Sequence, residues 1–181
     1  MERSRNARRF WALFGTVVGL DVTTKAMAVS ALLPQRLPHE VLGESVRLTL
    51  VYNPGAAFGL HLGPYSRWIF LCLTVGALVI LWRLYRSTRP GDWLRAVALG
   101  LVCGGAAGNL IDRIRSPLGV VDFIDVGIRD MRWPTFNVAD MAVSTGAFLL
   151  AWVLWGEDES AVAPAAETTG ALARSESRDV T

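Results

Sequence analysis

Residues 104–140 read GGAAGNLIDRIRSPLGVVDFIDVGIRDMRWPTFNVAD, and they join two strongly apolar segments through a short connection rich in aspartate. Asp122 lies within a hydrophobic string, between Val121 and Phe123, and Asp140 stands at the start of a long apolar run. An ionised side chain well inside a bilayer costs about 2.5 to 3.5 kcal/mol on insertion scales. The two aspartates are therefore expected to form a functional site.

The composition is that of an integral membrane protein. Of the 181 residues, 52% are hydrophobic and only 19% are charged, and the mean hydropathy is +0.35. These values are too apolar for an ordinary soluble domain. The net charge is +2, and the basic residues are scattered near the ends of apolar segments. This distribution argues against nucleic acid as a partner.

Four apolar segments are long enough to cross about 30 Å of hydrocarbon. They are predicted at residues 10–33, 68–84, 94–110 and 138–155, with outer connections at 34–67 and 111–137. Residues 46–52 alternate as a half-exposed strand does, and Asn53-Pro54-Gly55 ends that pattern. We therefore predict an all-α membrane protein: a bundle of four transmembrane helices with a small extracytoplasmic β element and loop.

The same pattern predicts one membrane domain over residues 1–155, followed by a polar tail at 156–181 that is expected to be disordered and cytoplasmic. Arginines are densest in the amino-terminal segment and between the second and third spans, which places both termini in the cytoplasm. The unusual polar residues of all the segments then converge on the outer membrane boundary. These are Asp21, Lys25, Asn53, Asn109, Asp112, Arg113, Asp122 and Asp140.

The chemistry that such a boundary offers is a carboxylate pair. Two aspartates held close together cannot both ionise cheaply, so one keeps its proton and the pair supplies an acid and a base. No metal is expected, because His39 and His61 are the only histidines and HExxH is absent. GxSxG is also absent, whereas a serine paired with Lys25 remains conceivable.

Structural roles compete with this interpretation. With Asn137 as N-cap, Asp140 occupies the third position of a helix, where a carboxylate meets free backbone N–H groups. From the pattern alone, Asp125 remains open as the second catalytic carboxylate. Ion pairs are expected between Asp21 and Lys25, four residues apart, and between Asp112 and either Arg113 or Arg115.

Five short blocks together resemble one family. They are DVTTK at 21–25, NPGAAF at 53–58, GNLIDR at 108–113, VVDF at 120–123 and FNVAD at 136–140. In this order, on a four-span layout, they resemble the lipoprotein signal peptidases, also called signal peptidase II. The resemblance implies that Asp122 and Asp140 are the catalytic aspartates. It further implies substrate-site positions at Asn53, Gly55, Asn109, Arg113 and Asn137, and supporting positions at Asp21, Lys25, Gly105 and Asp112.

The family implies an aspartic endopeptidase of the bacterial cytoplasmic membrane. Such an enzyme removes the signal peptide from a prolipoprotein immediately before a cysteine that carries diacylglycerol. The expected partners are prolipoproteins and membrane lipids, the expected state is a monomer, and no cofactor is implied. We expect the strand at 46–52 to cup the substrate, with the GAAF segment at 55–58 as a movable lid.

Two other classes of protein remain to be separated from a protease. A small proton-coupled carrier would also need intramembrane carboxylates, but it would place them near the midplane, within reach of both sides. A non-catalytic assembly or anchoring protein would need no carboxylate pair.

Overall fold

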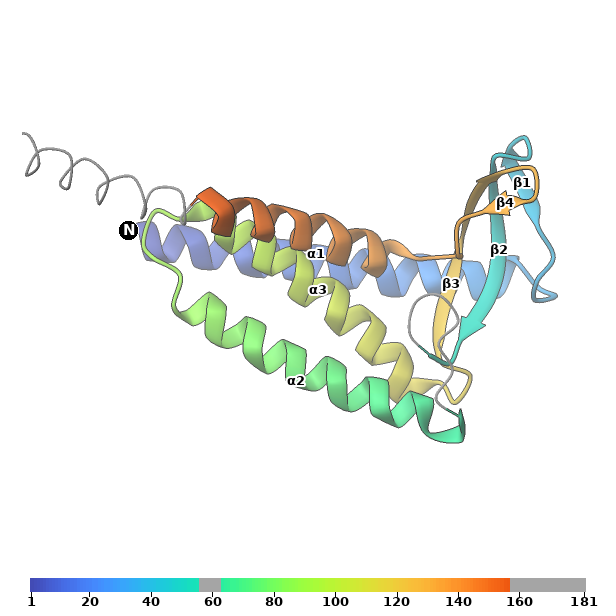
Figure 1. The fold of residues 1–181 in the computed structure, drawn as a ribbon, viewed down its shortest axis with the longest axis horizontal. Helices are drawn as coiled ribbons and strands as arrows, with labels where there is room; N and C mark the ends of the chain where they lie inside the picture. Colours follow the sequence, from blue (N-terminus) through green and yellow to red (C-terminus); the bar gives the residue numbers. More distant parts are fainter. Residues whose placement is uncertain (56–62, 157–181) are drawn as a thin grey trace, which may run out of the picture.

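Figure 1 shows the computed structural model, which describes residues 1–55 and 63–156. Four helices are long and apolar enough to cross a membrane: α1 (Glu2–Ala31), α2 (Ser66–Arg86), α3 (Trp93–Arg115) and a C-terminal helix (Val138–Gly156). A short 3₁₀ turn, η2 (Gly63–Tyr65), precedes α2. The bundle, together with a small antiparallel sheet, confirms the predicted fold class.

Helix α3 is the centre of the bundle. It packs against both α1 and α2, and it runs obliquely between them in Figure 1. Small residues allow this, because Gly100 and Gly104 lie against the backbone of α1 and Gly105 lies against the backbone of the C-terminal helix. By contrast, α2 buries little besides Ser66, so its apolar side chains are left to face lipid.

The helices differ from the predicted spans mainly at their ends. Helix α1 begins at Glu2, within the polar basic segment, and ends at Ala31 shortly before Pro34. Helix α3 continues past residue 110 to Arg115, so Asp112 and Arg113 belong to its last turn. The tail at 157–181 and the lid residues 56–58 lie outside the described residues.

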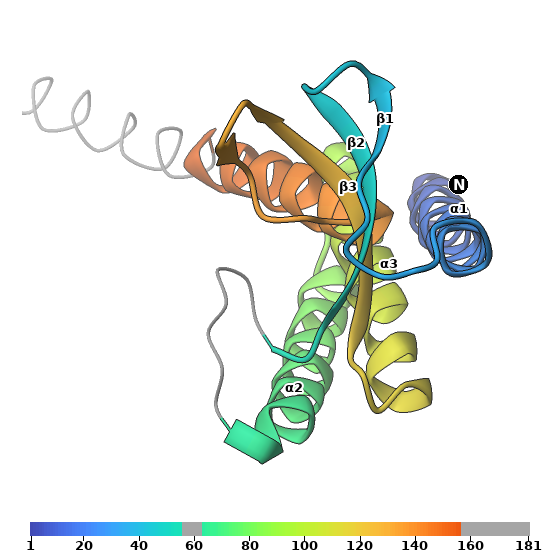
Figure 2. The same cartoon turned by 90° about the vertical axis from the view of Figure 1, so that its right-hand side faces the viewer.

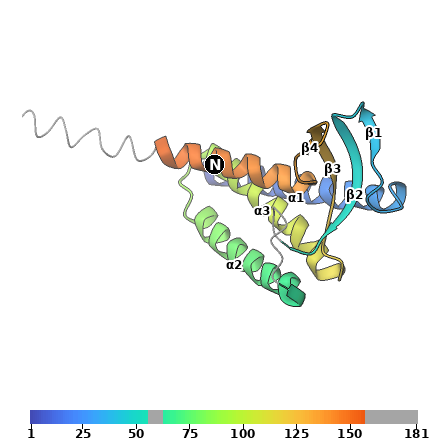
Figure 3. The ribbon, with the colours of Figure 1, turned by 45° about the vertical axis from the view of Figure 1, so that its right-hand side comes forward.

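Four strands form a sheet in the order β1-β2-β3-β4. They are β1 (His39–Leu42), β2 (Val46–Asn53), β3 (Val120–Ile128) and β4 (Met131–Arg132). Figures 2 and 3 show the two long strands crossing the ends of the helices. Successive side chains of a strand point to opposite faces, and this explains why Asp122 occurs between the apolar Val121 and Phe123 of β3. Val121 and Phe123 pack with the C-terminal end of α1, whereas Val120 and Asp122 face a cavity on the other side.

The two ends of the bundle differ in chemistry. The sheet covers one end, and the N-terminus and the connection between α2 and α3 lie at the other (Figure 1). Every site residue that the sequence predicted lies toward the sheet end or in the elements that pack behind it, as the contacts below show.

Candidate active site

Asp122 is held on the sheet by two asparagine side chains. In the β2–β3 register Asn53 lies opposite Val120 and Val51 opposite Asp122, so Asn53 and Asp122 are diagonal neighbours on one face. Asn53 Nδ2 donates to Asp122 Oδ2 at 3.1 Å, and Asn137 Nδ2 donates to Asp122 Oδ1 at 2.7 Å. These two hydrogen bonds fix the Asp122 side chain, and they satisfy both of its oxygens in a residue that is only 3% exposed.

Asp140 is fixed by the first turn of the C-terminal helix. Asn137 Oδ1 accepts from the backbone N–H of Asp140 at 2.9 Å, and Asp140 Oδ2 accepts from the backbone N–H of Asn137 at 3.2 Å. This reciprocal pair is the capping arrangement predicted from the sequence, with aspartate in place of the usual glutamate. The other oxygen, Asp140 Oδ1, accepts from Asn109 Nδ2 of α3 at 2.8 Å.

Two asparagines connect the two aspartates. Asn137 is fully buried, and it contacts Asp122 through its side chain and Asp140 through its backbone. Asn109 binds Asp140, and its own oxygen accepts from Asn137 Nδ2 at 3.2 Å. Hydrogen bonds among these four residues therefore connect β3, α3 and the start of the C-terminal helix.

The two carboxylates line one cavity of about 570 Å³. Four of the five predicted substrate-site residues also line it, whereas Asn137 lies behind the carboxylates. Those four are Asn53, Gly55, Asn109 and Arg113. Gly55 donates its backbone N–H to Asn53 Oδ1 at 3.0 Å, and Arg113 donates to the carbonyl of Asn109 at 3.2 Å.

Sequence reasoning missed one wall of the cavity. This wall consists of Trp133, Pro134, Thr135 and Phe136, with Val143 and Ser144 on the following helix. Phe136 pairs with Ile124 through backbone hydrogen bonds, which places the segment beside β3. The signal in the sequence was that residues 133–136 directly precede Asn137. Because Asn137 is predicted to cap a helix at the site, the residues next to it must also lie close to the site.

A buried lysine supports the site from behind. The Lys25 ammonium contacts Asp21 Oδ2, Asp112 Oδ2 and Asn109 Oδ1, each at 2.8 Å. The ammonium therefore donates one hydrogen bond, to Asn109, and forms ion pairs with the two carboxylates. The predicted pairing of Asp21 with Lys25 is confirmed. The predicted pairing of Asp112 with Arg113 or Arg115 is wrong, because the register between α1 and α3 brings Lys25 to Asp112 instead.

Asp21 and Asp112 each hold a further element in place. Asp21 Oδ1 accepts from the backbone N–H of Ala139 at 2.9 Å, so a side chain from α1 helps to cap the C-terminal helix. Asp112 Oδ2 accepts from the backbone N–H of Val121 at 3.1 Å, next to Asp122. Lys25 thus connects indirectly to the backbone beside both aspartates.

Gly105 permits the close approach that this arrangement needs. A side chain at this position would overlap the backbone oxygen of Ala139, directly before Asp140, and would press on Val143 Cγ2 at 2.8 Å. The supporting position that the resemblance implied is therefore a contact between α3 and the start of the C-terminal helix.

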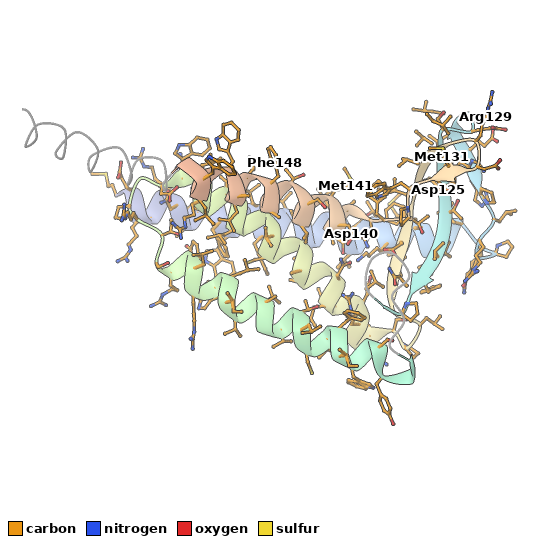
Figure 4. All side chains as sticks on the ribbon, in the orientation of Figure 1. Asp125, Arg129, Met131, Asp140, Met141 and Phe148 are labelled. Atoms are coloured by element: carbon orange, nitrogen blue, oxygen red, sulfur yellow. The ribbon has the colours of Figure 1, made fainter. Side chains whose placement is uncertain are left out.

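Asp125 has a different environment. Arg132 donates to Asp125 Oδ1 at 2.8 and 2.7 Å through two nitrogens, and Thr49 donates to Asp125 Oδ2 at 3.0 Å. Figure 4 places Asp125 toward the part of the sheet that carries Arg129 and Met131, whereas Asp140 lies at the start of the C-terminal helix. Asp125 does not line the cavity that contains Asp122 and Asp140.

The environment of Asp122 favours its protonated form. Burial raises the pKa of this carboxyl, and the nearby charge of Asp140 raises it further, to about 7, against the opposing hydrogen bonds from Asn53 and Asn137. Among residues 1–55 and 63–156, no group of three or more His, Cys, Asp and Glu side chains is placed to hold a metal ion. The chemistry that these described groups offer is acid–base chemistry by two carboxyls.

The fold and the site together define a membrane protein with two carboxylates that line one cavity at one end of a four-helix bundle. Solved structures share this fold. One, described as a bacterial membrane enzyme at 2.3 Å resolution, is 29% identical with a TM-score of 0.75, and the match covers 83% of this chain and 90% of that one. A second bacterial membrane enzyme, at 1.9 Å, is 30% identical with a TM-score of 0.70, covering 80% and 91% respectively.

Sequence comparison identifies the family. Residues 13–156 match the family model described as signal peptidase (SPase) II. The lipoprotein signal peptidase of Pelotomaculum thermopropionicum is 43% identical over 147 residues, which cover 81% of this chain and 91% of that protein. The lipoprotein signal peptidase of Mycobacterium avium is 43% identical over 152 residues, covering 81% and 78%. This chain belongs to the signal peptidase II family, and membership implies a membrane protease.

Proposed function

We propose that this protein is an aspartic endopeptidase that removes the signal peptide from prolipoproteins, cutting just before a cysteine that carries diacylglycerol. The observation that supports this most directly is the shared cavity of Asp122 and Asp140. The relatives named above carry the description lipoprotein signal peptidase, which supports the substrate class.

In this mechanism the two aspartates take different roles. We assign the starting proton to Asp122, the more buried of the two, because burial and the charge of Asp140 raise its pKa to about 7. It hydrogen-bonds the scissile carbonyl oxygen, while the ionised Asp140 takes a proton from a water molecule that attacks the carbonyl carbon. The carboxylic acid formed at Asp140 then protonates the leaving nitrogen, and cleavage frees the amino group of the lipidated cysteine.

The cavity walls suggest how a substrate is held. Asn53 and Gly55 lie on one side at the end of β2, and Trp133 to Phe136 form the other. An extended peptide that enters between the helices would place its scissile bond over the aspartates and leave its acyl chains in lipid. Arg113, at the end of α3, is close enough to the cavity to bind a polar part of the lipidated residue.

The proposed orientation follows from the arginines and the position of the site. Both termini lie in the cytoplasm, and the sheet with its cavity lies at the outer face of the bacterial cytoplasmic membrane. This orientation places the aspartates where an exported precursor emerges, at one boundary rather than at the midplane expected of a carrier.

The test is cleavage of a lipidated precursor peptide by purified protein. Asp122→Asn and Asp140→Asn are each expected to abolish cleavage, because the pair then lacks either its acid or its base. Asp130→Asn, the same change at an exposed aspartate of the turn between β3 and β4, is the matched control and should keep normal activity. Near-normal turnover by either of the first two variants would remove that aspartate from the mechanism.

A further inference from the structure

A second polar cavity lies at the opposite end of the bundle, away from the sheet. Its volume is about 340 Å³, within the range of about 300 to 1,000 Å³ usual for ligand pockets. Residues from α1, from the end of α2 and from the connection that follows α2 line it. They are Arg3, Asn6, Ala7, Tyr85, Arg86 and Thr88.

The cavity carries positive charge that no carboxylate among the described residues pairs with. Within the part of the chain that the structure describes, the guanidinium groups of Arg3 and Arg86 have neither a carboxylate partner nor a hydrogen bond. Two carboxylates at this end are already engaged. Glu2 pairs with Arg5 at 3.3 Å, and Asp92 accepts from the backbone N–H of Arg95 at 3.1 Å as the cap of α3.

Buried polar contacts hold the two walls of the cavity together. Asn6 is only 5% exposed, and its Nδ2 donates to the carbonyls of Arg89 and Asp92 at 3.3 and 3.4 Å. Tyr85 stacks on Phe10 with 3.9 Å between ring centroids. These contacts hold α1 against α2 and the following connection. The backbone positions of Arg3 and Arg86 are therefore fixed relative to each other.

Tryptophan side chains lie at the same end of the bundle as the cavity. Trp11, Trp82 and Trp93 are near the same helix ends, and all three remain partly exposed. Indole side chains favour the region of the lipid headgroups. Two guanidinium groups beside those tryptophans suit the phosphate of a headgroup, because each can donate parallel hydrogen bonds to its oxygens.

We propose that this cavity binds the phosphate group of an anionic phospholipid in the leaflet at the N-terminal end of the bundle. Arg3 and Arg86 contact the phosphate, and the acyl chains lie along the apolar surfaces of α1 and α2. Basic pockets between transmembrane helices are suited to such headgroups. The site is separate from the aspartate cavity, and the proposal holds or fails independently of the protease assignment.

The test counts lipid molecules retained by the full chain. Purified protein in neutral detergent is mixed with phosphatidylglycerol, with phosphatidylcholine, or with inorganic phosphate, and bound ligand is measured by native mass spectrometry. Phosphatidylglycerol is expected to bind in preference to both others. Arg3→Gln and Arg86→Gln should each weaken this binding about five-fold, the effect of one basic residue near an anionic lipid surface. Both residues are exposed, so the variants should fold.

Arg8→Gln is the matched control, because Arg8 is an exposed arginine at the same end of α1 that does not line the cavity. It should leave phosphatidylglycerol binding unchanged. Equal weakening by all three substitutions, or none by Arg3→Gln and Arg86→Gln, would overturn the proposal. Equal binding of inorganic phosphate and phosphatidylglycerol would overturn the assignment to a lipid. If one cavity variant fails to fold, the other decides the result.

Discussion

At the scale of single residues, the protonation of Asp122 leads to a prediction about pH. Its pKa of about 7 means that the proton is lost as the pH rises through that value, which leaves two adjacent negative charges and no acid to polarise the carbonyl. We therefore expect kcat/KM for a lipidated peptide to fall about ten-fold for each pH unit above about 7. Measuring the melting temperature over the same pH range separates this loss from unfolding.

A profile that stays flat to pH 9 would contradict the assignment of the proton to Asp122. A peptide without titrating side chains is the appropriate substrate, since its own ionisation cannot then shape the curve.

Lys25 gives a prediction of another kind, because its role is structural. Replacing Lys25 with methionine keeps much of the volume but leaves the buried Asp21 and the largely buried Asp112 without their cation. Removing one partner from a buried ion pair costs about 3 to 5 kcal/mol. We expect a clearly lower melting temperature in detergent, and a smaller loss of activity at low temperature than Asp122→Asn causes. Activity lost as completely as in Asp122→Asn, with no loss of stability, would instead indicate a direct role in the reaction.

At the scale of helices and strands, the contact between α3 and the C-terminal helix sets the distance between Asn109 and Asp140. Gly105→Ala would push a methyl group into the backbone at Ala139, so the helices must separate. Overpacking of this kind costs about 1 to 3 kcal/mol. We expect reduced stability and a loss of cleavage activity, because Asp140 moves with its helix.

Gly76→Ala is the matched control for that variant. A side chain at Gly76, in α2, would meet no atom within 4 Å, so the substitution should keep full activity and equal or greater stability. If the two variants behave alike in both assays, the close approach at Gly105 does not determine the geometry of the site.

At the scale of the whole molecule, the bundle has one sheet-covered end and one arginine-rich end, and the proposed function requires a particular orientation. Ser4 and Ser45 are exposed at opposite ends, before the first apolar run and between β1 and β2. We expect a membrane-impermeant maleimide to label Ser45→Cys in intact spheroplasts, and Ser4→Cys only after lysis. The parent chain, whose Cys72 and Cys103 lie within spans, gives the background. The reverse pattern would place the aspartates on the cytoplasmic side.

The apolar faces are the other feature of the whole molecule. Met141 and Phe148 lie exposed along the C-terminal helix (Figure 4), and α2 leaves most of its length uncovered. No other part of the described chain covers these surfaces. Their apolar side chains are therefore free to contact lipid, as expected for helices that cross a membrane. Inside the bundle, the close contacts at small residues act together with a buried apolar cluster around Phe10, Leu99 and Cys103.

The sequence by itself determined the four spans, the strand before Asn53, the cap formed by Asn137 and the pairing of Asp21 with Lys25. These features depend on hydropathy and on contacts between residues four apart or fewer, which a linear pattern contains. The family blocks then indicated which aspartates to place together.

Tertiary structure alone decided the contacts between distant segments. The partner of Asp112 is Lys25, Asp21 caps a helix that begins more than a hundred residues later, and Trp133 to Phe136 line the cavity. No local pattern fixes these, because they depend on how α1 and the C-terminal helix are aligned along α3. That alignment is set by which glycines let backbones touch and by which buried charges must find a partner once water is excluded.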